Sequence, residues 1–187
     1  MKIKSLKFKS VNSTNDIALD LIKKNKFKPT LISAEQQIKG RGTMGKKWVS
    51  KKGNLYLTIY FEIDQKKINF KHYAVLNAYL LKYIIRKNYS DQVQIKWPND
   101  LLIKKKKICG ILQEVLKNGE KNFLIIGIGI NTNFNPITKQ FNSISLKDIT
   151  KKKINNKKLL ENIKKEYENL LRRLKTYSFQ ELKKVYK

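Results

Sequence analysis

Alternating apolar and polar residues predict short strands along most of the chain, and apolar stripes at helical spacing predict three helices. One helix is expected to begin after Ser13-Thr14-Asn15, because small oxygen-bearing residues before an apolar stripe mark a helix N-terminus. The other two are expected over 71–87 and from about 155 to 186. The expected strands cover 2–9, 30–35, 54–63, 92–97, 101–103, 108–116 and 123–130.

The order of these elements favours an α+β fold. Segments 101–103 and 108–116 look like the two arms of a hairpin, and other neighbouring strands also follow each other without a helix between them. This order predicts a mixed, largely antiparallel sheet packed by helices rather than a doubly wound sheet. Two regions are expected: a main domain over 1–150 and a lysine-rich helical C-terminal segment over 151–187.

Composition narrows the chemistry. The 187 residues suit one domain, or one domain with a short appendage, and 41% hydrophobic residues are enough for a core. Cys109 and His72 are the sole residues of their kinds, which excludes an intramolecular disulfide, a thiolate cage and a His-pair metal site, and disfavours a Ser-His-Asp triad. The N-terminus has no apolar signal-peptide region and no run approaches about 18 apolar residues, so a cytoplasmic protein is expected.

The formal net charge of +28 has two possible interpretations. It could mark binding to nucleic acid or to an anionic membrane. However, arginine supplies only four of the 42 basic residues, at positions 41, 86, 172 and 173, whereas base readout usually favours arginine forks. Lysine spread along the whole chain beside many Asn and Ile is typical of an AT-rich coding bias, which is the favoured reading.

Segment 39–47 combines three glycines with four cations and is followed by Trp48. Glycines let the backbone approach a phosphate with its N–H groups exposed. Arg41 and Lys46 can neutralise negative charge on oxygen, and Trp48 offers a flat apolar face to a purine ring. The alternative is an ordinary surface loop, since the spacing matches neither a Walker loop nor G-x-G-x-x-G.

Two polar clusters could hold a charged or polar ligand. In Lys96-Trp97-Pro98-Asn99-Asp100, a lysine closes a predicted strand, where a rigidly held ammonium can bind a carboxylate or phosphate oxygen. A plain turn is the alternative, because Pro-Asn-Asp is good turn chemistry. Ser13-Thr14-Asn15 could bind a polar head group or serve only as a helix cap.

Two predicted strands contain glycine. Gly110, in segment 107–114, suggests close approach of a ligand or another backbone, whereas Glu114 in the same segment reads as an outward strand residue. In segment 127–132, glycines flank Ile128 and Asn131 could bond a base edge. The alternative is that these glycines are only small residues in a sheet, at a place where another element crosses it closely.

Taken in order, these five clusters resemble the catalytic domain of biotin–protein ligases, the biotin–[acetyl-CoA-carboxylase] ligase family. The resemblance covers roughly residues 8–135, and the Lys-Trp-Pro-Asn-Asp block and the glycine segment are its most specific parts. It implies a class II aminoacyl-tRNA synthetase-like fold, with 1–150 as the catalytic domain. It implies that biotin and Mg-ATP form biotinyl-5′-AMP, and that a lysine of a biotin carboxyl carrier protein then takes the biotin. Specific DNA and membrane are not expected as partners, and a homodimer is left open.

The resemblance also implies roles for individual residues. Arg41 and Lys96 are implied to be catalytic, with Lys96 on the carboxylate and α-phosphate, and no protein metal ligand is implied. The residues implied to bind biotin are Ser13, Thr14, Asn15, Gln37, Gly40, Arg41, Gly42, Thr43, Lys96 and Gly110. The residues implied to bind ATP or the adenylate are Arg41, Thr43, Lys46, Trp48, Lys96 and Asn131.

The chain departs from the family pattern in three places. Many members have arginine where this chain has Thr43 and often where it has Lys46, and only arginine makes a bidentate fork. No helix-turn-helix region precedes the catalytic part, which resembles the short class without a DNA-binding domain. After residue 154 the pattern is helical, so the SH3-type β-barrel that usually ends the family is expected to be absent.

Three alternatives stay open. A lipoate or octanoate ligase resembles the family in fold and also uses a lysine, although the Lys-Trp-Pro-Asn-Asp block favours biotin. A non-catalytic nucleic-acid-binding module is suggested by charge alone. A biotin-binding protein that no longer transfers biotin is suggested by Thr43 and the missing barrel.

Overall fold

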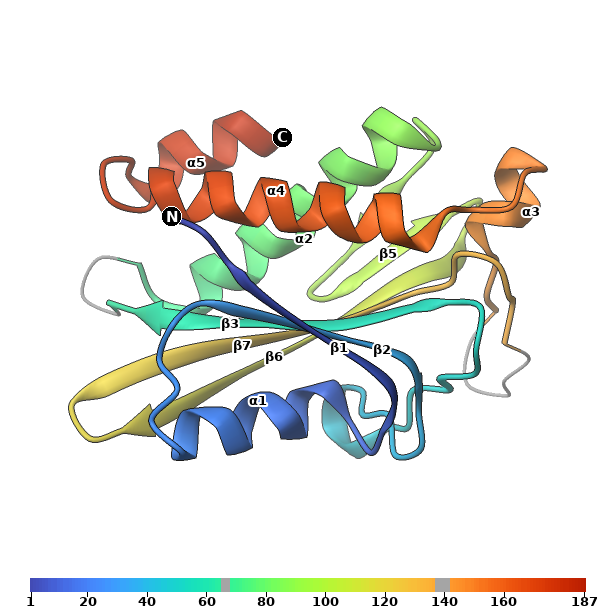
Figure 1. Cartoon of the computed structure of the whole chain (residues 1–187). Helices are drawn as coiled ribbons and strands as arrows, with labels where there is room; N and C mark the ends of the chain where they lie inside the picture. The colour runs from blue at the N-terminus through green and yellow to red at the C-terminus, as the bar shows by residue number, and fades with distance from the viewer. Residues whose placement is uncertain (65–67, 137–141) are drawn as a thin grey trace.

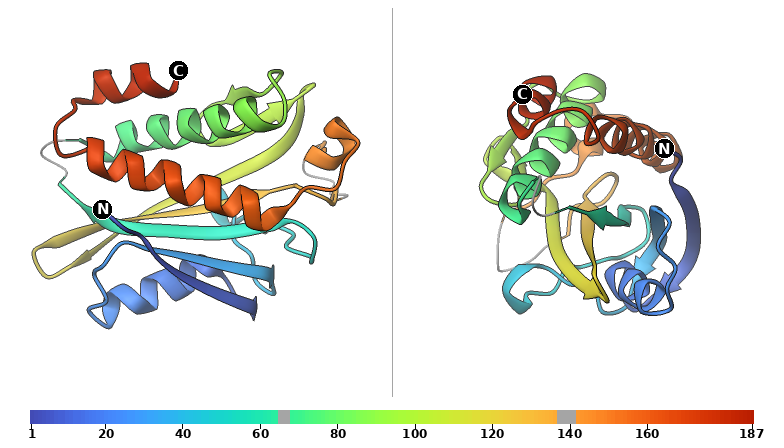
Figure 2. Two further views of the ribbon diagram at one scale, coloured as in Figure 1. Left: turned by 45° about the horizontal axis from the view of Figure 1, so that its top comes forward. Right: turned by 90° about the vertical axis from the view of Figure 1, so that its left-hand side faces the viewer.

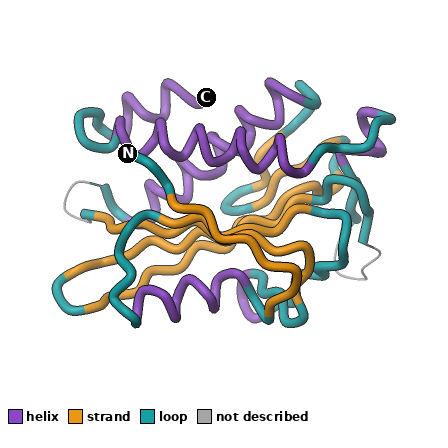
Figure 3. Tube along the Cα trace, in the orientation of Figure 1, coloured by secondary structure: helices purple, strands orange, loops and turns teal. Residues whose placement is uncertain are grey.

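A seven-stranded sheet forms the centre of the computed structural model, which describes residues 1–64, 68–136 and 142–187 (Figures 1 and 3). The strand order across the sheet is β1-β2-β3-β7-β6-β5-β4. The strands are β1 (Lys4–Val11), β2 (Thr30–Gln37), β3 (Leu55–Ile63), β4 (Gln94–Lys96), β5 (Asp100–Ile103), β6 (Lys106–Asn118) and β7 (Lys121–Ile130). The helices are α1 (Thr14–Lys23), α2 (Phe70–Asn88), α3 (Leu146–Thr150), α4 (Asn156–Arg173) and α5 (Phe179–Tyr186).

The sheet is mixed but largely antiparallel, which confirms the predicted fold class. β1 and β2 run parallel because α1 connects them, and all the other neighbouring pairs are antiparallel. β5, β6 and β7 follow each other through tight turns, so the predicted hairpin is also confirmed. The long β6–β7 ladder matters for function, because it pairs Gly110 directly with Gly129.

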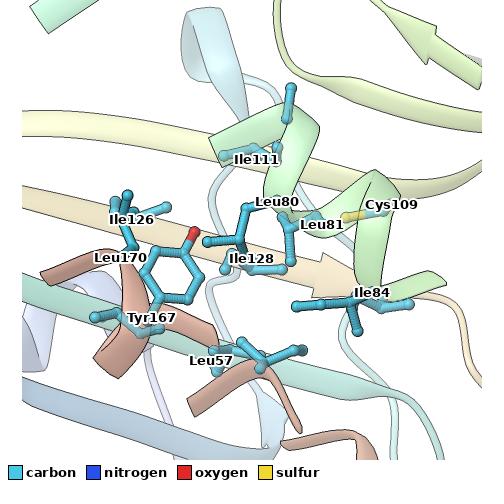
Figure 4. Close-up of a cluster of buried hydrophobic side chains, with 14 of the residues drawn as sticks. Leu57, Leu80, Leu81, Ile84, Cys109, Ile111, Ile126, Ile128, Tyr167 and Leu170 are labelled. Atoms are coloured by element: carbon cyan, nitrogen blue, oxygen red, sulfur yellow. The ribbon is translucent and has the colours of Figure 1, made fainter. Parts of the chain in front are cut away.

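Helices cover the two faces of the sheet unequally. α2, α4 and α5 lie on one face, and α1 lies on the other beside the loop that follows β2 (Figures 1 and 2). The larger core lies under α2, α4 and α5. It includes the cluster in Figure 4, where Tyr167 of α4 packs with Leu57 of β3 and Ile126 of β7. A smaller core lies under α1. The pocket described below lies on the face of α1.

The C-terminal region differs in detail from the sequence prediction. Ser178 starts α5 with a capping box, so the expected single helix is two helices, α4 and α5. The short helix α3 was not predicted; its N-terminus is a capping box at Ser145. Tyr167 and Tyr186 are buried in the larger core, so these helices pack on the same sheet as the rest of the chain. Within the described ranges, no helix has the length and apolar character needed to cross a lipid bilayer.

Candidate active site

A pocket lies on the α1 face of the sheet, where the start of α1, the loop after β2 and strands β3, β6 and β7 meet. We call residues 39–48 the glycine loop. Its side chains Arg41 and Trp48 line the pocket together with polar residues of α1. The space left for water-sized molecules is only about 40 Å³, enough for very few waters. A ligand larger than that has to displace part of the glycine loop.

Two glycines on adjacent strands form a flat floor for this pocket. Gly110 of β6 and Gly129 of β7 are register partners, and the Trp48 ring rests on both. A Cβ atom added at Gly110 would lie 2.7 Å from the ring, and one at Gly129 would lie 2.3 Å from its Nε1. Any side chain at either position would lift the tryptophan. Glycine is therefore needed here for close approach.

One end of the pocket is a network of neutral polar groups. Ser13 holds the N-cap position of α1, but its side chain makes no capping bond, which leaves the hydroxyl for another partner. The Thr14 backbone N–H and hydroxyl both donate to Gln37 Oε1, at 2.8 and 3.0 Å. The buried Thr58 hydroxyl lies 2.6 Å from Asn15 Oδ1. This end can therefore recognise a small ligand group that both donates and accepts hydrogen bonds.

The guanidinium of Arg41 is surrounded by carboxylates. Its Nη1 and Nη2 donate to Glu114 Oε1 and Oε2 at 2.9 and 3.0 Å, and Nη2 lies 3.0 Å from Asp16 Oδ1. Partial burial acts to lower the pKa of Arg41, but the hydrogen bonds and charges of Glu114 and Asp16 outweigh it, so the pKa is raised. Arg41 is therefore a fixed cation whose terminal nitrogens already have anionic partners.

Lys107 is the other cation in the pocket wall. Its Nζ lies 2.7 Å from Asp100 Oδ1 and 5.1 Å from the centre of the Trp48 ring. The two charged side chains are only 14% and 19% exposed. An ammonium this close to the glycine floor can attract a carboxylate or phosphate that enters the pocket.

A β-bulge turns Lys107 toward the pocket. In the β5–β6 ladder, Leu101 pairs with Cys109 and Leu102 pairs with Lys107, so Ile108 is one extra residue on β6. Ile108 and Cys109 are consecutive and both buried in the larger core. In a regular strand without the bulge, strict alternation would place residues three positions apart, such as Lys107 and Gly110, on opposite faces. With it, both line the same pocket.

The structure brings most of the predicted site residues together. The predicted residues that line the pocket are Ser13, Thr14, Asn15, Gln37, Arg41, Gly42, Thr43, Trp48 and Gly110. Among the others, Gly40 is a buried residue of the glycine loop, and a Cβ atom there would lie 2.4 Å from the Trp48 carbonyl. Lys46 is exposed on the outer side of that loop, and Asn131 is fully buried.

Lys96, which is predicted to hold the carboxylate and α-phosphate, lies outside this pocket. It is exposed at the end of the edge strand β4 and does not line the pocket. The reason is topological, because β4 is the last strand of the sheet and β5 and β6 separate it from the β7 side of the floor. Lys107 of β6 is the lysine that lines the pocket.

Sequence reasoning missed several lining residues. Asn99 donates to the Ile111 carbonyl and to the Thr43 hydroxyl, so it joins the turn before β5 to the glycine loop. Gly127 makes room for Asn15, whose Oδ1 would lie 2.3 Å from an added Cβ atom. Segments 96–100, 107–114 and 127–132 already contained these residues and Lys107. The missing information was which strands are neighbours.

Comparison with known proteins agrees with this geometry. The model of the biotin/lipoate A/B protein ligase family matches residues 7–131. The chain belongs to this family. The bifunctional ligase/repressor BirA of Escherichia coli is 37% identical over 123 residues, which are 65% of this chain and 38% of BirA. The chain thus spans less than half the length of such curated relatives.

Solved structures of this ligase family share the fold. The biotin protein ligase from Aquifex aeolicus, in complex with biotin and ATP, superposes with a TM-score of 0.79 and 30% identity, over 95% of this chain and 74% of that one. A bi-partite lipoate protein ligase from Thermoplasma acidophilum gives a TM-score of 0.64 at 11% identity, over 92% and 84% of the two chains. The second likeness concerns the fold alone.

Proposed function

We propose that this chain is an ATP-dependent biotin–protein ligase of the biotin–[acetyl-CoA-carboxylase] type. The observation that carries the proposal is one pocket with a neutral polar end, a glycine floor and a lysine. The ureido group of biotin donates and accepts hydrogen bonds, which matches the end formed by Ser13, Thr14 and Asn15. The Aquifex relative that binds biotin and ATP supports the same assignment.

The proposed reaction has two steps. The carboxylate oxygen of biotin attacks the α-phosphorus of ATP, which forms the biotinyl–AMP mixed anhydride and breaks the bond to pyrophosphate. The amine of an acceptor lysine then attacks the acyl carbon, loses a proton and releases AMP. The first step brings two anions together, and Lys107 in the pocket wall is placed to reduce their repulsion.

Exclusion of water protects the intermediate. A mixed anhydride hydrolyses if water reaches it, and the pocket beneath the glycine loop and Trp48 has only about 40 Å³ open to water-sized molecules. We propose that Trp48 moves off the glycine floor when biotin enters and then covers the adenylate. Asn131 Oδ1 is buried without a hydrogen-bond partner in the part of the chain that the structure describes, so a nucleotide amino group could satisfy it after a small rearrangement.

Magnesium would enter as part of the substrate. Among the described residues, no group of three or more His, Cys, Asp or Glu side chains could hold a metal ion. In Mg-ATP the phosphates supply most of the ligands, so the proposal requires no such group. The proposed acceptor is the lysine of a biotin carboxyl carrier protein, and the proposed compartment is the cytoplasm.

Biotin-dependent exchange of labelled pyrophosphate into ATP tests the proposal, with lipoate and octanoate as parallel substrates. Exchange with biotin alone is expected. Lipoate and octanoate carry no amide-like group at the end away from the carboxylate, so they offer the polar end around Asn15 no matching donor and acceptor. Exchange only with lipoate or octanoate would move the chain to the other branch of its family, and no exchange in folded protein would refute the ligase proposal.

A further inference from the structure

Glu114 connects three elements around the pocket, namely its own strand β6, helix α1 and the glycine loop. It projects from β6 and is 26% exposed. Its Oε2 accepts a 2.6 Å hydrogen bond from Asn15 Nδ2 at the start of α1, and both of its oxygens accept from Arg41 of the glycine loop. A single carboxylate therefore ties α1 and the glycine loop to the sheet.

The charges around Arg41 make it a poor receptor for a substrate anion in this conformation. One guanidinium carries +1, whereas Glu114 and Asp16 together carry −2, so the cluster is negative. Both terminal nitrogens of the guanidinium contact carboxylates already. An incoming phosphate would have to displace one of them and would meet repulsion from the other. This arrangement fits a clamp for the glycine loop better than a site for phosphate.

The same carboxylate sets the orientation of Asn15. An ionised carboxylate can only accept hydrogen bonds, so the Asn15 group that faces Glu114 must be the NH₂. Oδ1 is then directed to the Thr58 hydroxyl, at 2.6 Å, with Gly127 directly behind it. The amide in the polar end of the pocket therefore has one defined orientation.

We propose that Glu114 is a positioning residue, which holds the glycine loop over the pocket through Arg41, with the help of Asp16, and fixes the Asn15 amide for ligand recognition. This inference rests on the proposed function of the pocket. Glu114 touches no reacting atom in this role. Its loss should weaken binding of the acid far more than it slows adenylate formation, since Lys107 is held separately by Asp100.

Glu114→Gln tests the proposal with almost no change in shape. We expect the KM for biotin in pyrophosphate exchange to rise roughly tenfold, as for the loss of one charge-assisted hydrogen bond, while kcat stays within about threefold. Trypsin should also cleave after the exposed Lys46 and Lys47 roughly tenfold faster, because the glycine loop opens more often. The cleavage rate, followed by mass spectrometry, does not depend on catalysis.

Glu62→Gln is the matched control. It also breaks an ion pair on the sheet, to Lys121 at 2.8 Å, away from the pocket, so neither KM nor cleavage of the glycine loop should change. Arg41→Lys should act in the same direction as Glu114→Gln, and the double variant should be no worse than either single one if both report the same contact.

Two results would contradict the proposed positioning role of Glu114. One is a KM and a cleavage rate for Glu114→Gln that both match wild type, and the other is a fall in kcat with KM unchanged. If wild type exchanges pyrophosphate with none of the acids, the ligase proposal is wrong. The role of Glu114 in holding the glycine loop is then decided by the cleavage rates.

Discussion

Lys107→Met is the substitution with the sharpest expected outcome. It removes the ammonium while keeping an unbranched side chain of similar length. In the structure this ammonium lies 2.7 Å from the Asp100 carboxylate, and both side chains are mostly buried. The substitution should therefore weaken catalysis, by removing a cation from the pocket, and weaken the fold, by leaving Asp100 without that cation.

The two losses can be estimated separately. Removing one preorganised group that stabilises developing charge typically lowers kcat by about 10²–10³. Breaking a fully buried ion pair costs about 3–5 kcal/mol. Because this pair keeps some contact with solvent, about 1–3 kcal/mol is the better expectation here, and each kcal/mol lowers the melting temperature by about 2–4 °C in a chain of this size.

Pyrophosphate exchange and thermal unfolding measure the two effects. Adding Asp100→Asn removes the carboxylate that Lys107→Met leaves without its ion-pair partner. The double variant should therefore recover much of the melting temperature but none of the exchange rate. Lys96→Met serves as the comparison, because Lys96 is exposed and outside the pocket, and it should leave both quantities near wild type. A wild-type exchange rate in Lys107→Met, or an equal loss in Lys96→Met, would refute this assignment of the cation.

Two further substitutions probe other parts of the structure. Gly127→Ala would place a Cβ atom 2.3 Å from Asn15 Oδ1, so it should raise the Kd for biotin about 10–100-fold, as measured by calorimetry, and an unchanged Kd would count against Asn15 as a ligand contact. Burial raises the pKa of Tyr73 to about 12, whereas an unfolded tyrosine ionises near pH 10. The free energy of unfolding should therefore fall as pH rises from about 10 to 12, and Tyr73→Phe should make that fall smaller in urea titrations at each pH. Equal slopes for the two proteins would contradict this assignment.

The sequence was a good guide to the fold because the periodicity is strong. The apolar run that became β3 and the stripe that became α2 predict their elements almost to the residue. The break between α4 and α5 was missed because leucines continue on both sides of it, and only the capping box at Ser178 signals a new start. Local patterns thus identify the elements, but breaks that depend on caps need closer inspection.

The candidate site was only partly predictable. Clusters such as Ser13-Thr14-Asn15 and the glycine loop are local in sequence and were found. The choice between Lys96 and Lys107 was not local, since it depends on strand order and on the bulge at Ile108. Glu114 was read as an outward strand residue, and nothing near it in the sequence indicates that Asn15 and Arg41 fold onto it. Pairings across 99 and 73 residues are decided by the tertiary fold alone.

The extra residue in β6 has a consequence for how this segment can vary among relatives. The spacing between Lys107 and Gly110 and the bulge at Ile108 together decide which side of the sheet receives the positive charge. A regular strand with the present spacing would turn Lys107 to the opposite face, whereas deleting Ile108 would leave Lys107 two positions from Gly110 and on the same face. Insertions in the turn at Lys104 and Lys105 would have no such effect. The length of this short interval is therefore expected to vary among relatives only together with the presence of the bulge.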